Sequence, residues 1–235
     1  MFFYNDLSKI NLDDYNVIGV DETGVGDYFT PIIGCVAYLP NNLKEWAIQL
    51  GVQDSKKLST TKINFIAKEL IKKISYKTYT LTQKGYNSLT SKGFNANEIK
   101  YFIHFNAIGN YSNLFLNENK FDNDIFIVDR YSTFDSILRY KEKFNFIPDF
   151  KKTYELKNQV FFVTKAESVH LSVACASIIA RYYLINYMKK QSEEWNFQFP
   201  LGASQKVKEA VLNFEQLYGR NSLDSVCKTS FKIKK

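Results

Sequence analysis

Four acidic residues stand at places where the sequence predicts that buried strands end. Asp21 and Glu22 follow an apolar run at residues 17–20, Asp129 closes the segment "DIFIVD", and Glu167 follows "QVFFVTKA". Rigid strands can aim such carboxylates at one point, where they would repel one another unless cations lay among them. Hard oxygen ligands of this kind suit Mg²⁺ or Mn²⁺. Two such ions about 3.5–4 Å apart can activate water and stabilise the leaving oxygen when a phosphodiester is cleaved.

Each of these acids also has an ordinary structural explanation. Aspartate and glutamate are common at strand exits, and Glu167, next to Ser168, could simply favour the dipole of a following helix. The pair Asp21 and Glu22 is harder to explain in this way, because a turn with two glycines, Gly24 and Gly26, follows it directly.

The apolar pattern predicts strands that alternate with helices. Strands are predicted at residues 17–20, 31–39, 75–82, 124–129 and 159–167. Helices are predicted from a cap at Ser59 or Thr60, and at residues 95–117, 168–190 and 202–219. This order indicates an α/β or α+β sheet that is covered by helices.

Length and composition describe an ordinary folded chain with a basic surface. The 235 residues are 45% hydrophobic and 23% charged, and the formal net charge is +7. One large domain is expected. The positive charge favours a polyanion such as nucleic acid or an anionic membrane surface, although a solvated lysine-rich surface gives the same value.

Cysteine usage and the apolar runs indicate a cytoplasmic protein. Cys35, Cys175 and Cys227 are few and far apart, so neither a disulfide framework nor a zinc site is expected. The N-terminus has no secretory pattern and no apolar run is long enough to span a bilayer, so no membrane partner is expected.

Four ordered segments resemble one enzyme family. "DETGVGDYFTP" (21–31) resembles the signature of the type 2 ribonucleases H, and within them ribonuclease HIII, whose pattern reads Asp-Glu-x-Gly-x-Gly-Asp-Tyr-Phe-Gly-Pro. "DSKKLS" (54–59), "IVD" (127–129) and "KAESVHLSVACASIIAR" (165–181) resemble further segments of that family in order and spacing. "FPLGAS" and "CKTSFK" resemble its C-terminal part more loosely. The resemblance extends over nearly the whole chain from Val17.

The resemblance implies a fold, a reaction and a metal site. It implies a ribonuclease H-like α/β fold, with a central mixed sheet flanked by helices and a helical C-terminal part. It also implies endonucleolytic hydrolysis of the RNA strand of RNA–DNA hybrids, giving 3′-hydroxyl and 5′-phosphate ends. The catalytic and metal-binding residues would be Asp21, Glu22, Asp129 and Glu167, with two Mg²⁺ or Mn²⁺ ions. Glu167 favours the HIII branch, since the HII branch usually has aspartate there and Gly-Arg-Gly in the loop.

The domain organisation is expected to be simple. Residues 1–16 would be a short extension and residues 17–235 the catalytic domain. Only sixteen residues precede Val17, so the N-terminal substrate-binding domain that is usual in ribonuclease HIII is expected to be absent. A monomer is expected.

Two groups of residues are predicted to contact the substrate. The loop of Thr23, Gly24, Val25 and Gly26 would read the 2′-hydroxyl, because glycine lets backbone groups approach a sugar closely; a plain turn is the alternative. Ser55 and Lys56, just before a helix, would bind phosphate.

A helix face with small residues is a second candidate for backbone contacts. Ser177 and Arg181 lie one turn apart and share a face, which by resemblance meets the nucleic acid, although small residues there also allow close packing on a sheet. His170 is only three residues from Glu167, but a packed or surface histidine is the commoner case.

Two positions depart from the family pattern, and two other functions stay open. Thr30 stands where glycine is usual, and Val25 lies between the loop glycines. One alternative is HII-like incision at a single ribonucleotide in duplex DNA. The other is a protein that binds hybrids without cleaving them.

Overall fold

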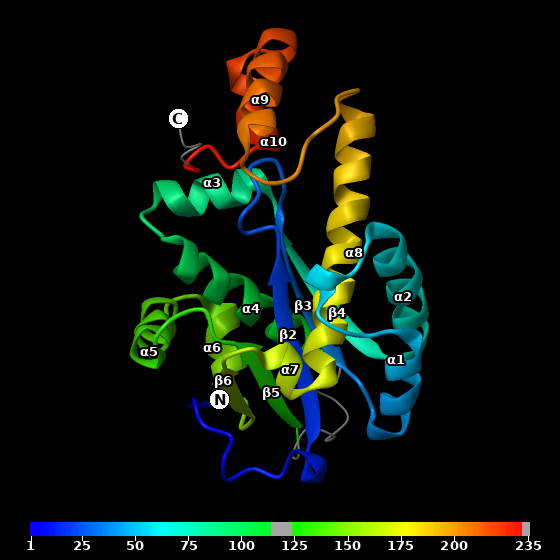
Figure 1. The fold of residues 1–235 in the computed structure, drawn as a ribbon. Coiled ribbons are helices and arrows are strands. Elements are labelled where there is room, and N and C mark those ends of the chain that lie inside the picture. The colour runs from blue at the N-terminus through cyan, green and yellow to red at the C-terminus, as the bar shows by residue number, and fades with distance from the viewer. Residues whose placement is uncertain (114–123, 232–235) are drawn as a thin grey trace.

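The computed structural model describes residues 1–113 and 124–231, whose strands form a six-stranded sheet. The strand order is β1-β6-β5-β2-β3-β4 (Figure 1). The strands are β1 (Phe2–Tyr4), β2 (Asn16–Thr23), β3 (Ile32–Tyr38), β4 (Ser75–Leu81), β5 (Asp124–Asp129) and β6 (Gln159–Val163).

The sheet is mixed. Strands β2, β3 and β4 are antiparallel neighbours, whereas β1, β6, β5 and β2 run parallel to one another. In the parallel half, Val17 of β2 lies opposite Ile125 of β5, and Val20 lies opposite Val128. Parallel strands finish at the same edge of a sheet, so the residues that end β2, β5 and β6 come together there.

Helices cover both faces of the sheet. On one face lie α8 (Leu171–Glu194), α2 (Thr60–Lys73) and α1 (Lys44–Leu50), and on the other α4 (Ala96–Ser112), α5 (Phe134–Lys143) and α6 (Pro148–Glu155) (Figure 1). Beyond the end toward which β2 points lie α3 (Gln83–Ser91), α9 (Gln205–Tyr218) and α10 (Leu223–Val226), while the short α7 (Ala166–Val169) precedes α8.

Side chains of β2 alternate between these two helical layers. Ile18 and Val20 pack in the cluster that includes α4, and Val17 packs against α8. Successive strand residues point to opposite faces. Asp21 therefore faces α8, and Glu22 faces α4.

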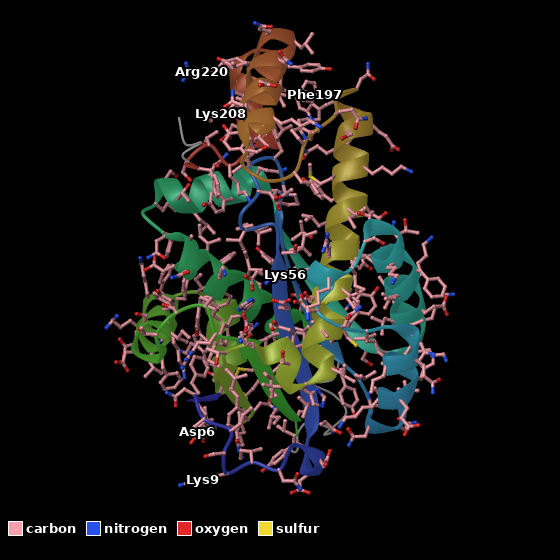
Figure 2. The ribbon with its side chains drawn as sticks, viewed as in Figure 1. Asp6, Lys9, Lys56, Phe197, Lys208 and Arg220 are labelled. Carbon is pink, nitrogen blue, oxygen red and sulfur yellow. The ribbon has the colours of Figure 1, made fainter. Side chains whose placement is uncertain are left out.

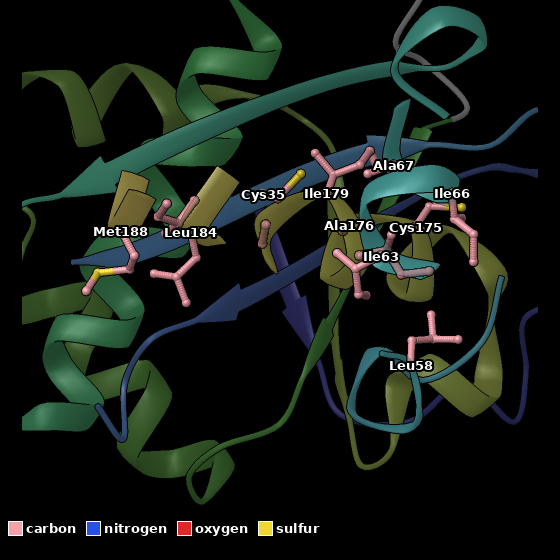
Figure 3. Close-up of a cluster of buried hydrophobic side chains, with 14 of the residues drawn as sticks. Cys35, Leu58, Ile63, Ile66, Ala67, Cys175, Ala176, Ile179, Leu184 and Met188 are labelled. Atoms are coloured by element: carbon pink, nitrogen blue, oxygen red, sulfur yellow. The ribbon is translucent and has the colours of Figure 1, made fainter. Parts of the chain in front are cut away.

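The helix α8 lies close against the sheet because its inner face carries small residues. Ala174, Cys175 and Ala176 are fully buried, and they pack with the apolar side of α2 and with β3 (Figure 3). By length and composition alone α8 could cross a membrane, but here its apolar residues fill the core of the domain.

The contact between β2 and α8 leads to a stability prediction. A Cβ on Gly19 would lie 2.2 Å from the backbone of Val173. Because backbone cannot yield cheaply, we expect Gly19→Ala to destabilise the fold by about 1–3 kcal/mol or more. Urea denaturation followed by circular dichroism measures this loss.

The matched control is Gly26→Ala. A Cβ on Gly26 would meet nothing within 4 Å. We expect its free energy of unfolding to change by no more than about 0.5 kcal/mol. Equal unfolding midpoints for the two variants would show that α8 does not lie as close to β2 as described.

The predicted elements agree with the structure in type and mostly in extent. Four predicted strands are confirmed as β2, β3, β4 and β5, and the side chain of Ser59, not Thr60, caps α2 by accepting from the Lys62 N–H. The helix predicted at residues 95–117 is confirmed as α4 through Ser112, and its last part, residues 114–117, lies outside the described residues.

Two predicted boundaries were wrong, and several elements were not foreseen. The strand expected at 159–167 ends at Val163, and the helix expected at 168–190 is divided at His170 into α7 and α8. Lys165 adopts a left-handed conformation (φ 54°), which turns the chain out of the strand before Glu167. The elements not foreseen include β1, which pairs with β6, and the helices α1, α3, α5, α6 and α10.

Candidate active site

The parallel register of β2 and β5 places three of the four acids at one edge of the sheet. Val20 lies opposite Val128, so Asp21 and Asp129 are the next residues along two neighbouring strands. Asp129 also lies opposite Val163, the last residue of β6. The strand ends thus bring Asp21, Glu22 and Asp129 together, as the sequence predicted.

Glu167 joins them through a short turn and a helix. After β6 the chain turns at Lys165, and the N–H of Ala166 donates a hydrogen bond of 3.1 Å to Oδ1 of Asp129. This bond holds Asp129 and keeps the residue before Glu167 beside it. Burial raises the pKa of Asp129, and the charges of Glu167 and Glu22 raise it further. The acids are therefore close enough to act on one another electrostatically.

Asp21 is the acid that is most affected by this crowding. Burial, followed by the negative charge of Glu22, raises its pKa to about 8, although a hydrogen bond from Ser177 works in the opposite direction. Without a cation, Asp21 is therefore protonated below that pH.

Glu22 lies in the opposite environment, against α4. Its Oε2 is 2.7 Å from Nε2 of His104, and its Oε1 is 3.0 Å from Nζ of Lys100. Burial alone would raise the pKa of Glu22, but the hydrogen bond and charge of His104, together with Lys100, lower it to about 2. Glu22 is consequently an anion at every ordinary pH.

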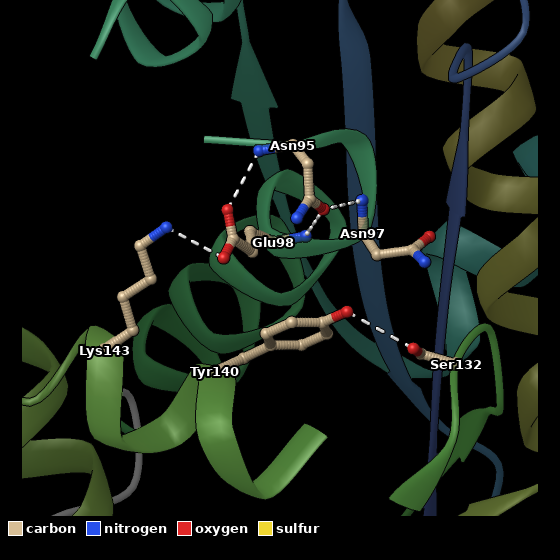
Figure 4. A network of polar contacts seen from close by, with 6 residues as sticks. All are labelled: Asn95, Asn97, Glu98, Ser132, Tyr140 and Lys143. Atoms are coloured by element: carbon tan, nitrogen blue, oxygen red, sulfur yellow. Dashed lines mark hydrogen bonds and ion pairs between the residues drawn. The ribbon is translucent and has the colours of Figure 1, made fainter. Parts of the chain in front are cut away.

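The start of α4 fixes the position of this pair. The Asn95 side chain caps the helix by accepting from the N–H groups of Asn97 and Glu98. In turn, the Glu98 carboxylate accepts a hydrogen bond from the N–H of Asn95 (Figure 4). Lys143 of α5 lies 2.8 Å from Glu98 and ties the two helices together. A capped first turn holds the next turn, which carries Lys100, in register.

The loop after Asp129 is held against the same helices. Ser132 Oγ lies 3.3 Å from the hydroxyl of Tyr140 on α5 (Figure 4). The ring of Tyr131 contacts the ring of His104, with centroids 5.3 Å apart. The ends of β2 and β5 therefore share one support on the α4 side.

The four carboxylates fit a hard divalent cation by donor chemistry. In residues 1–113 and 124–231, no three histidine, cysteine, aspartate or glutamate side chains are already gathered as a metal cluster. Asp21 and Glu22 face different layers, and only their strand position brings them to one edge. Burial, and then the charge of Glu22, raise the pKa of Asp21, and a cation bound by carboxylate oxygens would favour its ionised form.

The residues predicted to contact phosphate gather next to the acids. Ser55 Oγ lies 2.8 Å from Ser177 Oγ, and an Arg181 guanidinium N–H donates to the carbonyl of Ser55 at 2.5 Å. The charge of Lys56 partly offsets the rise in the pKa of Asp129, and this exposed lysine (Figure 2) belongs to the short 3-10 turn Ser55–Lys57, which packs against α8. The structure thus joins Ser55, Lys56, Ser177 and Arg181, although Ser177 also lies on the closely packed face of α8.

The glycines of the loop after β2 have different roles. Gly24 has φ +88°, and a Cβ there would lie 2.2 Å from the carbonyl oxygen of Pro31, so only glycine fits. Gly26 is open to space. Val25 packs its side chain against the cluster that contains Ile32, which explains an apolar residue between the two glycines.

Thr30, the other departure from the family pattern, is buried and holds the loop through a hydrogen bond. Its hydroxyl donates to the carbonyl of Gly24 at 3.1 Å. The rest of the loop is held from distant elements: Phe29 O accepts from Gln83 and Gln191, and Asp27 accepts from the N–H of Gly202 at 2.6 Å.

Sequence reasoning did not identify Lys100 and His104 as partners of Glu22, but its expectation that His170 is a packed histidine is confirmed. His170 begins α8, where its Nδ1 accepts from the Ser172 N–H at 3.2 Å, and burial lowers its pKa to about 4. The available signal was the spacing of Lys100 and His104, four residues apart on one face of a predicted helix. No local pattern indicated that this face meets Glu22.

Comparisons with known proteins find relatives that match most of this chain. The family model described as Ribonuclease HII matches residues 18–234. The chain is 35% identical to the ribonuclease HIII of Phytoplasma mali, covering 93% of this chain and 71% of that protein. It is 36% identical to that of Bacillus velezensis, covering 92% and 65%.

A solved structure supports the same relationship. The crystal structure of Bst-RNase HIII in complex with Mn²⁺ superposes with a TM-score of 0.82 at 30% identity, covering 93% of this chain and 67% of that one. The chain therefore spans about two thirds of the length of these relatives.

Proposed function

Since this chain belongs to the ribonuclease HII family, we propose that it cleaves the RNA strand of RNA–DNA hybrids, leaving 3′-hydroxyl and 5′-phosphate ends. One observation carries the proposal most strongly. The ends of β2 and β5 and the turn after β6 bring four carboxylates within electrostatic reach of one another. A site of acids beside Ser55, Lys56 and Arg181 suits a phosphodiester better than any neutral substrate.

Asp21, Glu22, Asp129 and Glu167 would hold two divalent ions, Mg²⁺ or Mn²⁺. When bound, such ions supply charge neutralisation, a more acidic water and stabilisation of the leaving oxygen. The Mn²⁺ complex of Bst-RNase HIII supports this choice of ion for the family.

The chain's own groups prepare the site in three ways. His104 and Lys100 keep Glu22 ionised and fix its direction. The N–H of Ala166 orients the carboxylate of Asp129. Ser55, Lys56 and Arg181 would bind the sugar–phosphate backbone, which sets the position of the strand and carries no sequence information.

The loop of residues 23–26 would distinguish RNA from DNA. Backbone groups beside Gly24 and Gly26 can approach a ribose closely, and the 2′-hydroxyl is both a donor and an acceptor. The loop begins directly after Glu22, so the sugar that it contacts would lie next to the acids.

One assay separates this function from its alternatives. Purified protein is incubated with Mg²⁺ or Mn²⁺ and either a labelled continuous hybrid or a DNA duplex with one ribonucleotide. We expect cleavage of the continuous hybrid, with products that carry 3′-hydroxyl ends. The Asp129→Asn variant, treated in parallel, controls for contaminating nucleases.

Two other outcomes would point elsewhere. Cleavage of the duplex with one ribonucleotide would show HII-like incision by this protein. The match to the HII family model is the reason for including that substrate. Binding of the hybrid without cleavage under either metal would leave a hybrid-binding protein and would refute the proposed reaction.

A further inference from the structure

A buried lysine from the C-terminal segment holds the loop that follows β2. Lys228 has no exposed surface, and its Nζ donates to the carbonyl oxygen of Gly24, 204 residues away in the chain. Its backbone N–H also donates to the carbonyl of Tyr28 at 2.9 Å. One residue therefore binds this loop at two points, Gly24 and Tyr28.

The neighbours of Lys228 anchor it firmly. Asn87 of α3 donates to the carbonyl of Cys227 at 2.9 Å and accepts from the N–H of Thr229 at 2.9 Å. The ammonium group also lies 5.6 Å from the ring centroid of Tyr86. Asn87 thus fixes the backbone on both sides of Lys228, and the ring of Tyr86 lies against its ammonium group.

Packing alone does not account for a lysine at this place. Burial of an ammonium group is unfavourable, and burial lowers the pKa of Lys228 to about 8. Methionine would fill a similar volume without that penalty. What the lysine adds is a strong donor directed at Gly24.

The bond to Gly24 fixes one peptide plane. The carbonyl of Gly24 accepts from Lys228, from the Thr30 hydroxyl at 3.1 Å and from the Asp27 N–H at 3.4 Å. In a trans peptide the C=O and the next N–H point in opposite directions. The N–H of Val25 therefore points away from these three donors.

Glycine makes this orientation easy to lose. At φ +88°, Gly24 lies in a region where the adjoining peptide can rotate without a Cβ clash of its own. Rotation of the peptide between Gly24 and Val25 would turn the N–H inward and present the carbonyl instead.

We propose that Lys228 is a positioning residue that, together with Thr30, sets the 24–25 peptide plane and so determines how strongly the loop prefers a 2′-hydroxyl. This inference rests on the proposed function, because it assumes that the loop contacts the ribose. It gives the C-terminal segment a part in substrate specificity without placing it at the acids.

The test measures binding, so that it does not depend on turnover. In an Asp129→Asn background, fluorescence anisotropy gives the Kd for a DNA hybrid with RNA and for the same duplex with DNA in place of the RNA, which lacks the 2′ oxygen that would accept from the Val25 N–H. We expect the parent to prefer RNA by about two- to tenfold, the range of one neutral hydrogen bond. Lys228→Met should reduce that preference to nearly one.

Matched variants distinguish positioning from general damage. Lys206→Met removes an exposed lysine from α9 and should leave the preference unchanged. Lys228→Met should also melt no lower than the parent, because it removes a buried charge and methionine fills a similar volume. An unchanged preference in Lys228→Met would overturn the proposal.

Thr30 provides a second route if Lys228→Met does not fold. Thr30→Val should lower the RNA preference, and Thr30→Ser, which keeps the hydroxyl, should restore it. Equal preference in both Thr30 variants would overturn the inference. A parent that binds hybrid with no 2′ preference would instead refute the reading role of the loop, which belongs to the proposed function.

Discussion

Asp129→Asn is expected to reduce hybrid cleavage by at least about 10³-fold, the scale on which loss of one preorganised electrostatic group acts. Asp129 lies between Asp21 and the turn that carries Glu167, and it accepts the Ala166 N–H. Asparagine can keep that hydrogen bond, so the fold should remain while one negative metal ligand is lost. Single-turnover cleavage of a labelled hybrid measures the loss.

The same strand offers a matched control. Asp124 begins β5, where its Oδ1 accepts from the Asn16 side chain at 2.9 Å, far from the other acids along the strand. We expect Asp124→Asn to cleave at nearly the parent rate. Comparable activity in Asp129→Asn and Asp124→Asn would remove Asp129 from the catalytic site.

Asp21→Asn is expected to abolish cleavage and yet stabilise the metal-free protein at alkaline pH. The folded-state pKa of Asp21 is raised from 3.8 to about 8, first by burial and then by Glu22. The folded state therefore holds a proton that the unfolded state has lost. Stability falls as the pH rises from about 4 to about 8 and then levels off.

The size of this effect follows from the linkage. A raised pKa of this kind destabilises the ionised folded state by an amount on the order of a few kcal/mol. For a chain of this length, we expect Asp21→Asn to raise Tm by about 5 °C or more at pH 8.5 and by little at pH 5. Differential scanning calorimetry in the presence of a chelator makes the comparison.

Metal binding gives the same prediction a second readout. A cation must displace the proton of Asp21, so the apparent affinity for Mn²⁺ should rise by up to about tenfold per pH unit until pH 8. Glu22, whose pKa is lowered to about 2, contributes no such slope. A pH-independent Mn²⁺ affinity, or an Asp21→Asn variant that melts lower at pH 8.5, would contradict the electrostatic description of the site.

Much of the fold and of the candidate site could be predicted because the signals are local. The apolar runs of β2, β3 and β5, the alternation of β4 and the cap of α2 at Ser59 are encoded by neighbouring residues. Acids at the ends of buried strands indicated a shared edge, and the parallel pairing of β2 with β5, which the structure shows, groups Asp21 with Asp129. The end of β6 at Val163 was missed because it depends on a left-handed turn at Lys165. Lysine is not a residue type that indicates such a turn in a sequence.

By itself, the sequence determined which residues are the four acids, which loop follows them and which family the motifs resemble. Only the tertiary structure decided which groups support them. His104 meets Glu22 across 82 residues, and Lys228 meets Gly24 across 204. The physical reason is that a hydrogen bond depends on atoms a few ångströms apart. The path of the chain that brings such distant residues together is set by how the whole sheet and its helices pack.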